Sequence, residues 1–319
     1  MPHLLIAGKL HPSGLALLDR TEGVSYEYVE DLSEQSYVPL VGRADALVIR
    51  TQPLTAATVA KAGRLKIVSR HGVGYDSVDV AALNARAIPL CIVGDVNSVS
   101  VAEHAMMLIL ACAKMLIRAD RAVRGGGWAW RNRLETGEIA GRRLLILGYG
   151  RAGRHLARMA AGLGMEIRAH DPFLRVEDWP AGPAAPAGSL AAGLAWAEVI
   201  SVHAPKTARP LLGAEELAQV VPGVILVNTA RGGVVEEGAL AAALAAGRVG
   251  AAGLDVFDDE PPAADHPLLA FDQVVATPHT AGLTRQAAER MAVASVRNVL
   301  DFFAGRIDPD LIVNKEFPT

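Results

Sequence analysis

The chain of 319 residues carries a formal net charge of −3, and 51% of its residues are hydrophobic and 20% charged. This length and composition predict two domains, or one large one, with ample material for a core. Because there is no basic excess, we do not expect nucleic acid as a partner. Cys91 and Cys112 are too few for a disulfide framework or a zinc cluster, so we expect a reducing, cytoplasmic setting and no metal site.

A short apolar strand, a turn and an Ala-rich helical stretch recur along the chain. Continuous apolar runs are typical of buried parallel strands. Their alternation with helical patterns predicts an α/β fold, with parallel sheets covered by helices on both faces. The predicted strands are 3–8, 46–50, 66–70, 88–92, 144–148, 166–170, 199–203, 224–228, 250–257 and 274–278.

The most membrane-like segment is SVSVAEHAMMLILACAKMLI, residues 98–117. Charged and polar side chains interrupt it, so it falls short of the roughly 18 apolar residues of a membrane span. We therefore expect one long buried helix, started by a capping box of Ser100 and Glu103, and no contact with a membrane. The N-terminal MPHLLIAGKL also lacks the charged start of a signal peptide. A new β-α-β series begins at residue 144, so the domain boundary is predicted in the long helix.

Two segments in the second half of the chain, 180–189 and 284–305, have their own patterns. Pro and Gly punctuate residues 180–189 too often for a helix, which predicts a surface loop. Residues 284–305 read as one amphipathic helix with Gly305 as its C-cap. The apolar residues 311–313 are then expected to form a strand that returns to the first domain.

A glycine-rich turn follows the strand predicted at 144–148 and precedes a helix. Its G-x-G-x-x-G pattern permits a tight turn, close approach of a pyrophosphate and close packing of helix on strand. The next strand ends at Asp171, where a carboxylate can bind both ribose hydroxyls and repel a 2′-phosphate. This favours NAD (NADH) over NADP, although a structural turn with a capping Asp is the alternative. The turn residues predicted to bind the cofactor are Gly148, Tyr149, Gly150, Arg151, Ala152 and Gly153.

Polar side chains follow three further strands. Arg231 follows the strand at 224–228, Glu260 follows the one at 250–257, and His279 follows the one at 274–278. Ligands bind outside the carboxyl ends of the strands in such sheets. Reduction of a 2-keto acid needs a cation for the carboxylate and carbonyl and a proton donor for the new alkoxide. Taken singly, each residue could instead be an ordinary loop or surface side chain.

The ordered motifs GYGRAG, HDP, HAPKT, NTARGG, LDVFDDEPP and PHTAG resemble the D-isomer-specific 2-hydroxyacid dehydrogenases. RHGVGYDSVD and NSVSVAEHAM resemble that family's substrate loop and linker helix, so the resemblance runs from about residue 45 to residue 314. It implies a flavodoxin-like substrate-binding lobe (1–96 plus 284–319), an NAD-binding Rossmann lobe (97–283) and an active-site cleft between them. It also implies a homodimer that packs through the region 98–117.

The resemblance implies a role for each matching residue. Arg231 would bind the substrate carboxylate and carbonyl, and His279 would be the acid–base catalyst paired with Glu260. The backbone amides of Val73 and Gly74 would bind the carboxylate. Asn97 is a further predicted substrate contact. The residues predicted to line the cofactor are His203, Pro205, Thr207, Thr229, Ala230, Asp255 and Gly282.

The substrate stays open at this point. Arg50 lies where phosphoglycerate dehydrogenases of the family bind the phosphate, which suggests 3-phosphoglycerate, but it could be a structural arginine. Hydroxypyruvate or glyoxylate is the other strong candidate, whereas Glu260 argues against the formate dehydrogenase branch. Ala152 stands where the family often has Ile, and Arg131 and Arg133 have no assigned role. The alternative function is that of the corepressors of this fold, which sense NADH and bind partner proteins.

Overall fold

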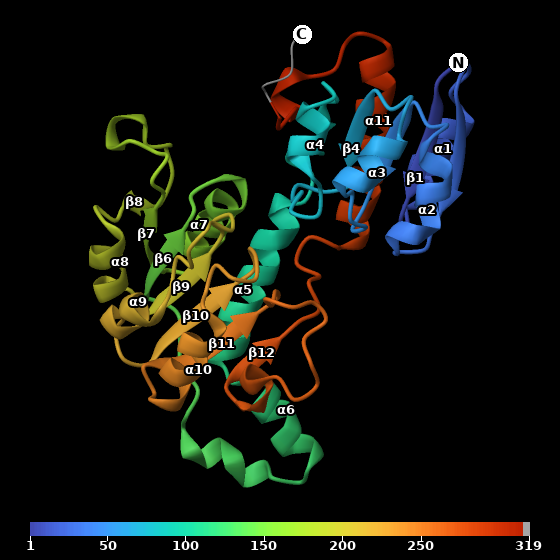
Figure 1. Cartoon of the computed structure of the whole chain (residues 1–319). Helices are drawn as coiled ribbons and strands as arrows, with labels where there is room; N and C mark the ends of the chain where they lie inside the picture. The colour runs from blue at the N-terminus through green and yellow to red at the C-terminus, as the bar shows by residue number, and fades with distance from the viewer. Residues whose placement is uncertain (315–319) are drawn as a thin grey trace. The chain divides into compact units, whose positions relative to one another are not determined.

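The chain divides into two compact units in a computed structural model that describes residues 1–314. Unit 1 contains Met1–Asn97 and Leu283–Thr319, and unit 2 contains Ser98–Gly282. Each unit is built on one parallel sheet with helices on both faces (Figure 1). The predicted α/β class with two parallel sheets is confirmed.

The sheet of unit 1 has the flavodoxin-like strand order. Its strands are β1 (His3–Ala7), β2 (Ser25–Val29), β3 (Ala46–Ile49), β4 (Ile67–Arg70) and β5 (Leu90–Cys91). They pair in the order β2-β1-β3-β4-β5, and every pairing is parallel. The strand order therefore reverses between β1 and β3.

Helices cover both faces of this sheet, because alternate strand residues are apolar on each side. Leu5, Leu47 and Val68 pack toward the helices of one face, and Leu4, Val48 and Ile67 pack toward those of the other. The first face carries α2 (Glu34–Val41), α3 (Ala56–Lys61) and α4 (Val80–Asn84), and the second carries α1 (Pro12–Asp19) and α11 (Arg285–Phe303). The short 3₁₀ helix η4 (Pro309–Leu311) follows α11.

The sheet of unit 2 has the Rossmann strand order with one added strand. Its strands are β6 (Arg143–Leu147), β7 (Glu166–His170), β8 (Ala185–Pro186), β9 (Val199–Val202), β10 (Val224–Asn228), β11 (Val249–Leu254) and β12 (Val274–Ala276). They pair in parallel in the order β12-β11-β10-β9-β6-β7-β8. The order reverses between β6 and β9, beside the glycine-rich turn.

The core of unit 2 also has two layers. One layer lies under α5 (Ser98–Ala113) and α7 (Arg151–Gly162), and the other lies under α8 (Leu190–Trp196), α9 (Ala214–Gln219) and α10 (Glu237–Ala245). The remaining elements are α6 (Leu116–Arg124), η1 (Trp128–Arg133), η2 (Val176–Asp178) and η3 (Pro267–Ala270).

The helix predicted at 98–117 is shorter than expected. The segments α5 and α6 are bent by 59° at a break, where Met115 has a left-handed backbone with φ 49°. Ser100 is buried inside α5, which starts at Ser98, so the predicted capping box is wrong. Among the described residues no single helix is long and apolar enough to cross a membrane. Only α5 and α6 taken together reach that length and apolar composition, and they form a bent pair.

Three strand predictions also differ from the structure. The two-residue edge strand β8 lies inside the segment 180–189 that was predicted as a surface loop. The edge strand β2 was not predicted, because its sequence SYEYV alternates polar and aromatic residues and every residue is half-buried. Residues 311–313 form no strand. Ile312 makes a single antiparallel bridge to Cys91, and the Val313 amide donates to the Leu90 carbonyl at 2.9 Å. The chain therefore returns to unit 1 as expected, but with fewer backbone pairs.

Candidate functional site

Most predicted catalytic and cofactor residues lie at one edge of the unit 2 sheet. Because all its strands are parallel, their carboxyl ends share one edge (Figure 1). The glycine-rich turn follows β6, Asp171 follows β7 and His203 follows β9. Thr229 and Arg231 follow β10, Asp255 follows β11, and His279 follows β12. This is the edge at which open α/β sheets bind ligands.

The three glycines of the turn have separate structural reasons. Gly148 has φ 93°, and a Cβ there would lie 2.7 Å from the backbone of His203. A Cβ on Gly153 would lie 2.3 Å from the Gly148 carbonyl oxygen, so only glycine lets α7 pack on the turn. A Cβ on Gly150 would meet no atom within 4 Å. The middle glycine thus faces open space, as an approach path for a pyrophosphate requires.

The N-terminus of α7 suits an anion. Gly150 is its N-cap, no side chain caps it, and Arg151 and Ala152 begin its first turn, which has no acidic residue. The first backbone N–H groups of such a helix point outward and carry the positive end of the helix dipole. The turn and the helix therefore fit the diphosphate of a dinucleotide.

Asp171 ties the turn to the end of β7. Its Oδ2 accepts from the Tyr149 amide at 2.9 Å, and its Oδ1 accepts from the Phe173 amide at 3.0 Å. The carboxylate thus has the structural role considered above, and it keeps lone pairs for further donors because each oxygen can accept more than one bond. The Tyr149 ring is buried and stacks on Trp179, with ring centroids 5.1 Å apart. Tyr149 therefore offers its backbone to the turn rather than its ring.

His203 is a neutral histidine at the end of β9. Its Nε2 lies 2.9 Å from the Ser201 hydroxyl, and its buried Nδ1 has no hydrogen-bond partner among the described residues. Burial lowers the pKa of His203 to about 4. Nearby on the same loop, Pro205 and Thr207 are exposed, and Thr207 donates to the Arg209 carbonyl at 2.6 Å.

The neighbouring strand end is more enclosed. Thr229 is buried, and its hydroxyl has no partner among the described residues. The Ala230 amide donates to the Asn228 side chain at 3.0 Å, which closes the turn after β10.

His279 and Glu260 form a hydrogen-bonded pair. His279 Nδ1 lies 2.6 Å from Glu260 Oε2, and both side chains are part-exposed, at 48% and 37%. The other carboxylate oxygen accepts from the Phe257 amide at 3.2 Å. Nδ1 is therefore occupied, and Nε2 is the ring nitrogen left to face a ligand.

The turn that carries Arg231 is pressed against the segment that carries Glu260. A Cβ on Gly232 would lie 1.9 Å from the Phe257 carbonyl oxygen, so only glycine permits this approach. The Arg231 carbonyl accepts from the Asn228 side chain at 2.9 Å. The Arg231 guanidinium donates to the Ala230 carbonyl at 2.6 Å. The structure therefore brings the loops of all three predicted catalytic residues together.

Asp255 organises the loop of His279. It is 1% exposed, its carboxylate accepts from the Thr280 and Ala281 amides at 2.9 and 2.8 Å, and Gly282 follows directly. His104 on α5 reaches the same group and was not predicted as a site residue, because its partners are distant in sequence. The only signal in the sequence was a histidine in a mostly apolar helix, in the motif VAEHAM.

Arg50 and Arg70 lie at the carboxyl edge of unit 1, where Glu30 and Asp31 also follow β2. Arg50 follows β3 at the point where the strand order reverses, and a Cβ on Gly8, at the end of β1, would lie 2.8 Å from the Arg50 Cβ. Arg70 ends β4 and donates to the His71 carbonyl at 2.7 Å. The half-buried Val73 and Gly74 follow in the same loop, and Asn97 lies at the end of this part of unit 1.

His71 is a second residue that was not predicted. Its side chain is buried, and neither ring nitrogen has a hydrogen-bond partner among the described residues. Burial, together with the positive charges of Arg50 and Arg70, lowers the pKa of His71 to about 4. Its imidazole is therefore neutral at physiological pH.

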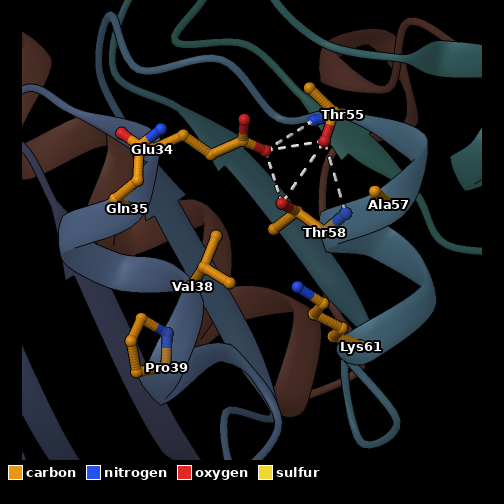
Figure 2. A pocket seen from close by; sticks show the side chains of 8 residues that line it. All are labelled: Glu34, Gln35, Val38, Pro39, Thr55, Ala57, Thr58 and Lys61. Atoms are coloured by element: carbon orange, nitrogen blue, oxygen red, sulfur yellow. Dashed lines mark hydrogen bonds between the residues drawn. The ribbon is translucent and has the colours of Figure 1, made fainter.

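A hollow of about 320 Å³ between α2 and α3 contains none of the predicted site residues. Figure 2 shows that Glu34 points toward Thr55 and Thr58 across this hollow. One Glu34 oxygen accepts from the Thr55 hydroxyl at 2.7 Å and also from the Thr58 hydroxyl. These contacts hold the start of α3 and explain the polar groups there. Among residues 1–314 no cluster of three or more His, Cys, Asp or Glu side chains could hold a metal ion.

Comparisons with known proteins agree with this geometry. Residues 106–281 match the model for the D-isomer specific 2-hydroxyacid dehydrogenase, NAD binding domain. The D-3-phosphoglycerate dehydrogenase of Mycobacterium tuberculosis is 40% identical over 98% of this chain and 59% of its own length. The chain thus spans about three-fifths of the length of that relative.

Two solved structures match nearly end to end. The TT0316 protein from Thermus thermophilus is 32% identical, with a TM-score of 0.86 over 96% of this chain and 98% of that one. An NADPH-dependent glyoxylate/hydroxypyruvate reductase from Sinorhizobium meliloti is 26% identical, with a TM-score of 0.87 over 100% of both chains.

Proposed function

Because the chain belongs to the D-isomer-specific 2-hydroxyacid dehydrogenase family, we propose that it interconverts a D-2-hydroxy acid and its 2-keto acid with NAD. The observation that carries this proposal is the His279–Glu260 pair, held at 2.6 Å on the sheet edge that also bears the glycine-rich turn. A histidine oriented by a carboxylate is suited to proton transfer.

The residues of the unit 2 edge fit a dinucleotide. Gly148, Gly150 and the start of α7 would hold the diphosphate, and Asp171 would accept from the ribose hydroxyls. The carboxylate of Asp171 would repel a 2′-phosphate, so NAD is proposed over NADP. His203, Pro205, Thr207, Thr229, Ala230, Asp255 and Gly282 complete the proposed lining. When bound, NADH supplies the hydride that reduces the keto carbon.

His279 would supply the proton. In the direction of reduction, protonated His279 donates from Nε2 to the carbonyl oxygen, which becomes the hydroxyl. In the reverse direction, neutral His279 takes that proton back. Glu260 holds Nδ1 and so keeps the ring oriented in both directions.

Arg231 would bind the substrate carboxylate and polarise its carbonyl. The planar guanidinium can donate two parallel hydrogen bonds to a carboxylate. Its place in a turn closed by Gly232 against Phe257 supports this role, because that packing fixes the turn relative to Glu260. The backbone amides of Val73 and Gly74, and the side chain of Asn97, are the further substrate contacts we propose.

A phosphorylated substrate, 3-phosphoglycerate, is the leading candidate. Two arginines at the edge of unit 1 support it, because Arg50 and Arg70 lie at the ends of the neighbouring strands β3 and β4. The 40% identity to an enzyme named D-3-phosphoglycerate dehydrogenase gives further support. Hydroxypyruvate or glyoxylate is the rival, and it would not need Arg50.

We also propose a homodimer, with a second copy as the partner. Neither α6 nor η1 has a buried residue. Large apolar side chains are exposed on the segment 116–134, which contains α6 and η1. They are Leu116, Ile117, Val123, Trp128 and Leu134. Such an exposed cluster is typical of an interaction surface. The proposed contact therefore begins inside the region 98–117 that the sequence suggested, at Leu116 and Ile117, and extends beyond it to Leu134.

The test of the proposed function is the variant Arg231→Ala. It is expected to lower kcat/KM by roughly 10³-fold, since a charged contact to the reacting group is lost in the transition state. NADH binding, followed by fluorescence titration, should survive. Arg306→Ala, which removes an exposed arginine paired with Asp301, is the matched control. Near-normal kcat/KM in Arg231→Ala would contradict the assignment.

A further inference from the structure

A histidine on α5 contacts the loop that carries the proposed acid–base catalyst. His104 Nε2 lies 2.9 Å from the Thr277 hydroxyl and 3.4 Å from Asp255 Oδ1. Its side chain is only 16% exposed. Three elements therefore meet at this point, namely α5, the end of β11 and the end of β12.

The directions of these hydrogen bonds follow from counting donors. Asp255 is buried and ionised, so its oxygens can only accept. The Thr277 hydroxyl lies 2.5 Å from Asp255 Oδ1 and must use its single hydrogen for that contact. Its oxygen is then an acceptor toward His104, whose Nε2 must carry a hydrogen. The result is a chain in which His104 donates to Thr277 and Thr277 donates to Asp255.

Asp255 connects these hydrogen bonds to the backbone of His279. Its carboxylate accepts from the amides of Thr280 and Ala281, and its carbonyl accepts from the His279 amide at 2.9 Å. His279 itself has a left-handed backbone with φ 51°, which for a residue other than glycine persists only where the surroundings hold it. Burial raises the pKa of Asp255, but donors that include His104 and Thr277 more than offset this, so the pKa is lowered.

We propose that His104 is a positioning residue for the catalytic step. Its Nε2–H fixes the Thr277 hydroxyl toward Asp255, and Asp255 then holds the 277–281 loop in the conformation that presents His279 to Glu260. The inference rests on the proposed function, since it assigns His104 a part in the same reaction. His104 touches neither His279 nor Glu260 directly in this chain of contacts, so it acts through the loop.

The test compares three single variants. His104→Leu replaces the Nε2–H donor with an apolar side chain of similar size. His104→Gln keeps an N–H near the place of Nε2, and Glu103→Gln changes an exposed neighbour on the same helix. We expect His104→Leu to lower kcat about 10-fold with little change in the Kd of NADH. His104→Gln should recover most of that loss, and Glu103→Gln should match the wild type.

A second readout does not depend on turnover. The amides of Thr280 and Ala281 donate to Asp255, so their hydrogen exchange reports how firmly the loop is held. We expect exchange in the peptide spanning 277–282 to speed up in His104→Leu and to stay slow in His104→Gln. If the wild-type protein reduces no keto acid, the proposed function fails, and the exchange rates still decide whether His104 holds the loop.

Thr277→Val breaks the same chain without touching α5. Both changes would break the same hydrogen-bonded connection between His104 and Asp255. The kcat of the double variant with His104→Leu should therefore be no lower than that of either single variant. Multiplicative losses in the double variant would overturn the proposal. So would an unchanged kcat with unchanged exchange in His104→Leu, or an equal loss in His104→Leu and His104→Gln.

Discussion

The two sheets carry different charged groups at their carboxyl edges. In unit 2 the edge carries Arg231 and three carboxylates that already have partners. Asp171 accepts from two amides, Asp255 accepts from loop amides and Thr277, and Glu260 pairs with His279. In unit 1 the edge carries Arg50 and Arg70 with the buried, neutral His71.

The difference follows from what each edge is proposed to bind. Ribose hydroxyls and a proton-transferring histidine need fixed acceptors, and internal hydrogen bonds keep those acceptors in place before any ligand arrives. A substrate with two acidic groups needs cations instead. The edge of unit 2 is therefore organised by its own contacts, and that of unit 1 is best completed by an anion.

The largest expected effect distinguishes two glycines of the same turn. Gly153→Ala would place a Cβ 2.3 Å from the Gly148 carbonyl oxygen, so we expect a loss of about 3 kcal/mol in the free energy of unfolding. Gly150→Ala meets no atom within 4 Å and should fold normally but bind NADH more weakly. Chemical denaturation and NADH titration measure the two effects. Equal stability losses in both variants would show that the turn is not organised as described.

The next effect concerns acid stability. The folded pKa of about 4 for His71 and for His203 lies below the unfolded value of 6.5. Between these pH values the unfolded chain binds more protons, so stability is full above about pH 6.5 and is lost as the pH falls toward 4. Each histidine is expected to contribute a loss of about 2 kcal/mol by pH 5.

Denaturant unfolding at a series of pH values measures this loss. His71→Leu should flatten the pH dependence for unit 1, and His203→Leu should flatten it for unit 2. A pH dependence as steep in both variants as in the wild type would mean that neither imidazole is kept neutral by burial.

The smallest expected effect tests what completes the unit 1 edge. Arg50→Ala should raise the KM for 3-phosphohydroxypyruvate about 10-fold, since one charge-assisted contact is lost, and should leave the KM for pyruvate unchanged. Arg43→Ala, which removes an exposed arginine paired with Glu27, is the control. A preference for the phosphorylated substrate that survives Arg50→Ala would exclude the phosphate role.

Most of the sheet framework was predictable because buried parallel strands are continuous apolar runs; those at 166–170 and 224–228 were predicted with their observed bounds. The strand β2 escaped because an edge strand needs no apolar run, and the break at Met115 escaped because hydrophobicity continues across it. The glycine-rich turn and the loops of Arg231, Glu260 and His279 were readable from local motifs. His104 was not, because its contact with Thr277 spans 173 residues.

The proposed dehydrogenase activity is tested most directly by loss of nicotinamide absorbance with NADH, then NADPH, across a panel of keto acids. The panel contains hydroxypyruvate, glyoxylate, pyruvate, phenylpyruvate, 2-ketoglutarate and 3-phosphohydroxypyruvate, with His279→Ala measured beside the wild type. We expect fast NADH-linked turnover of one acid, slower turnover with NADPH, and a loss of roughly 10³-fold in His279→Ala. Clear NADH binding without turnover of any acid would contradict it and favour an NADH-sensing role.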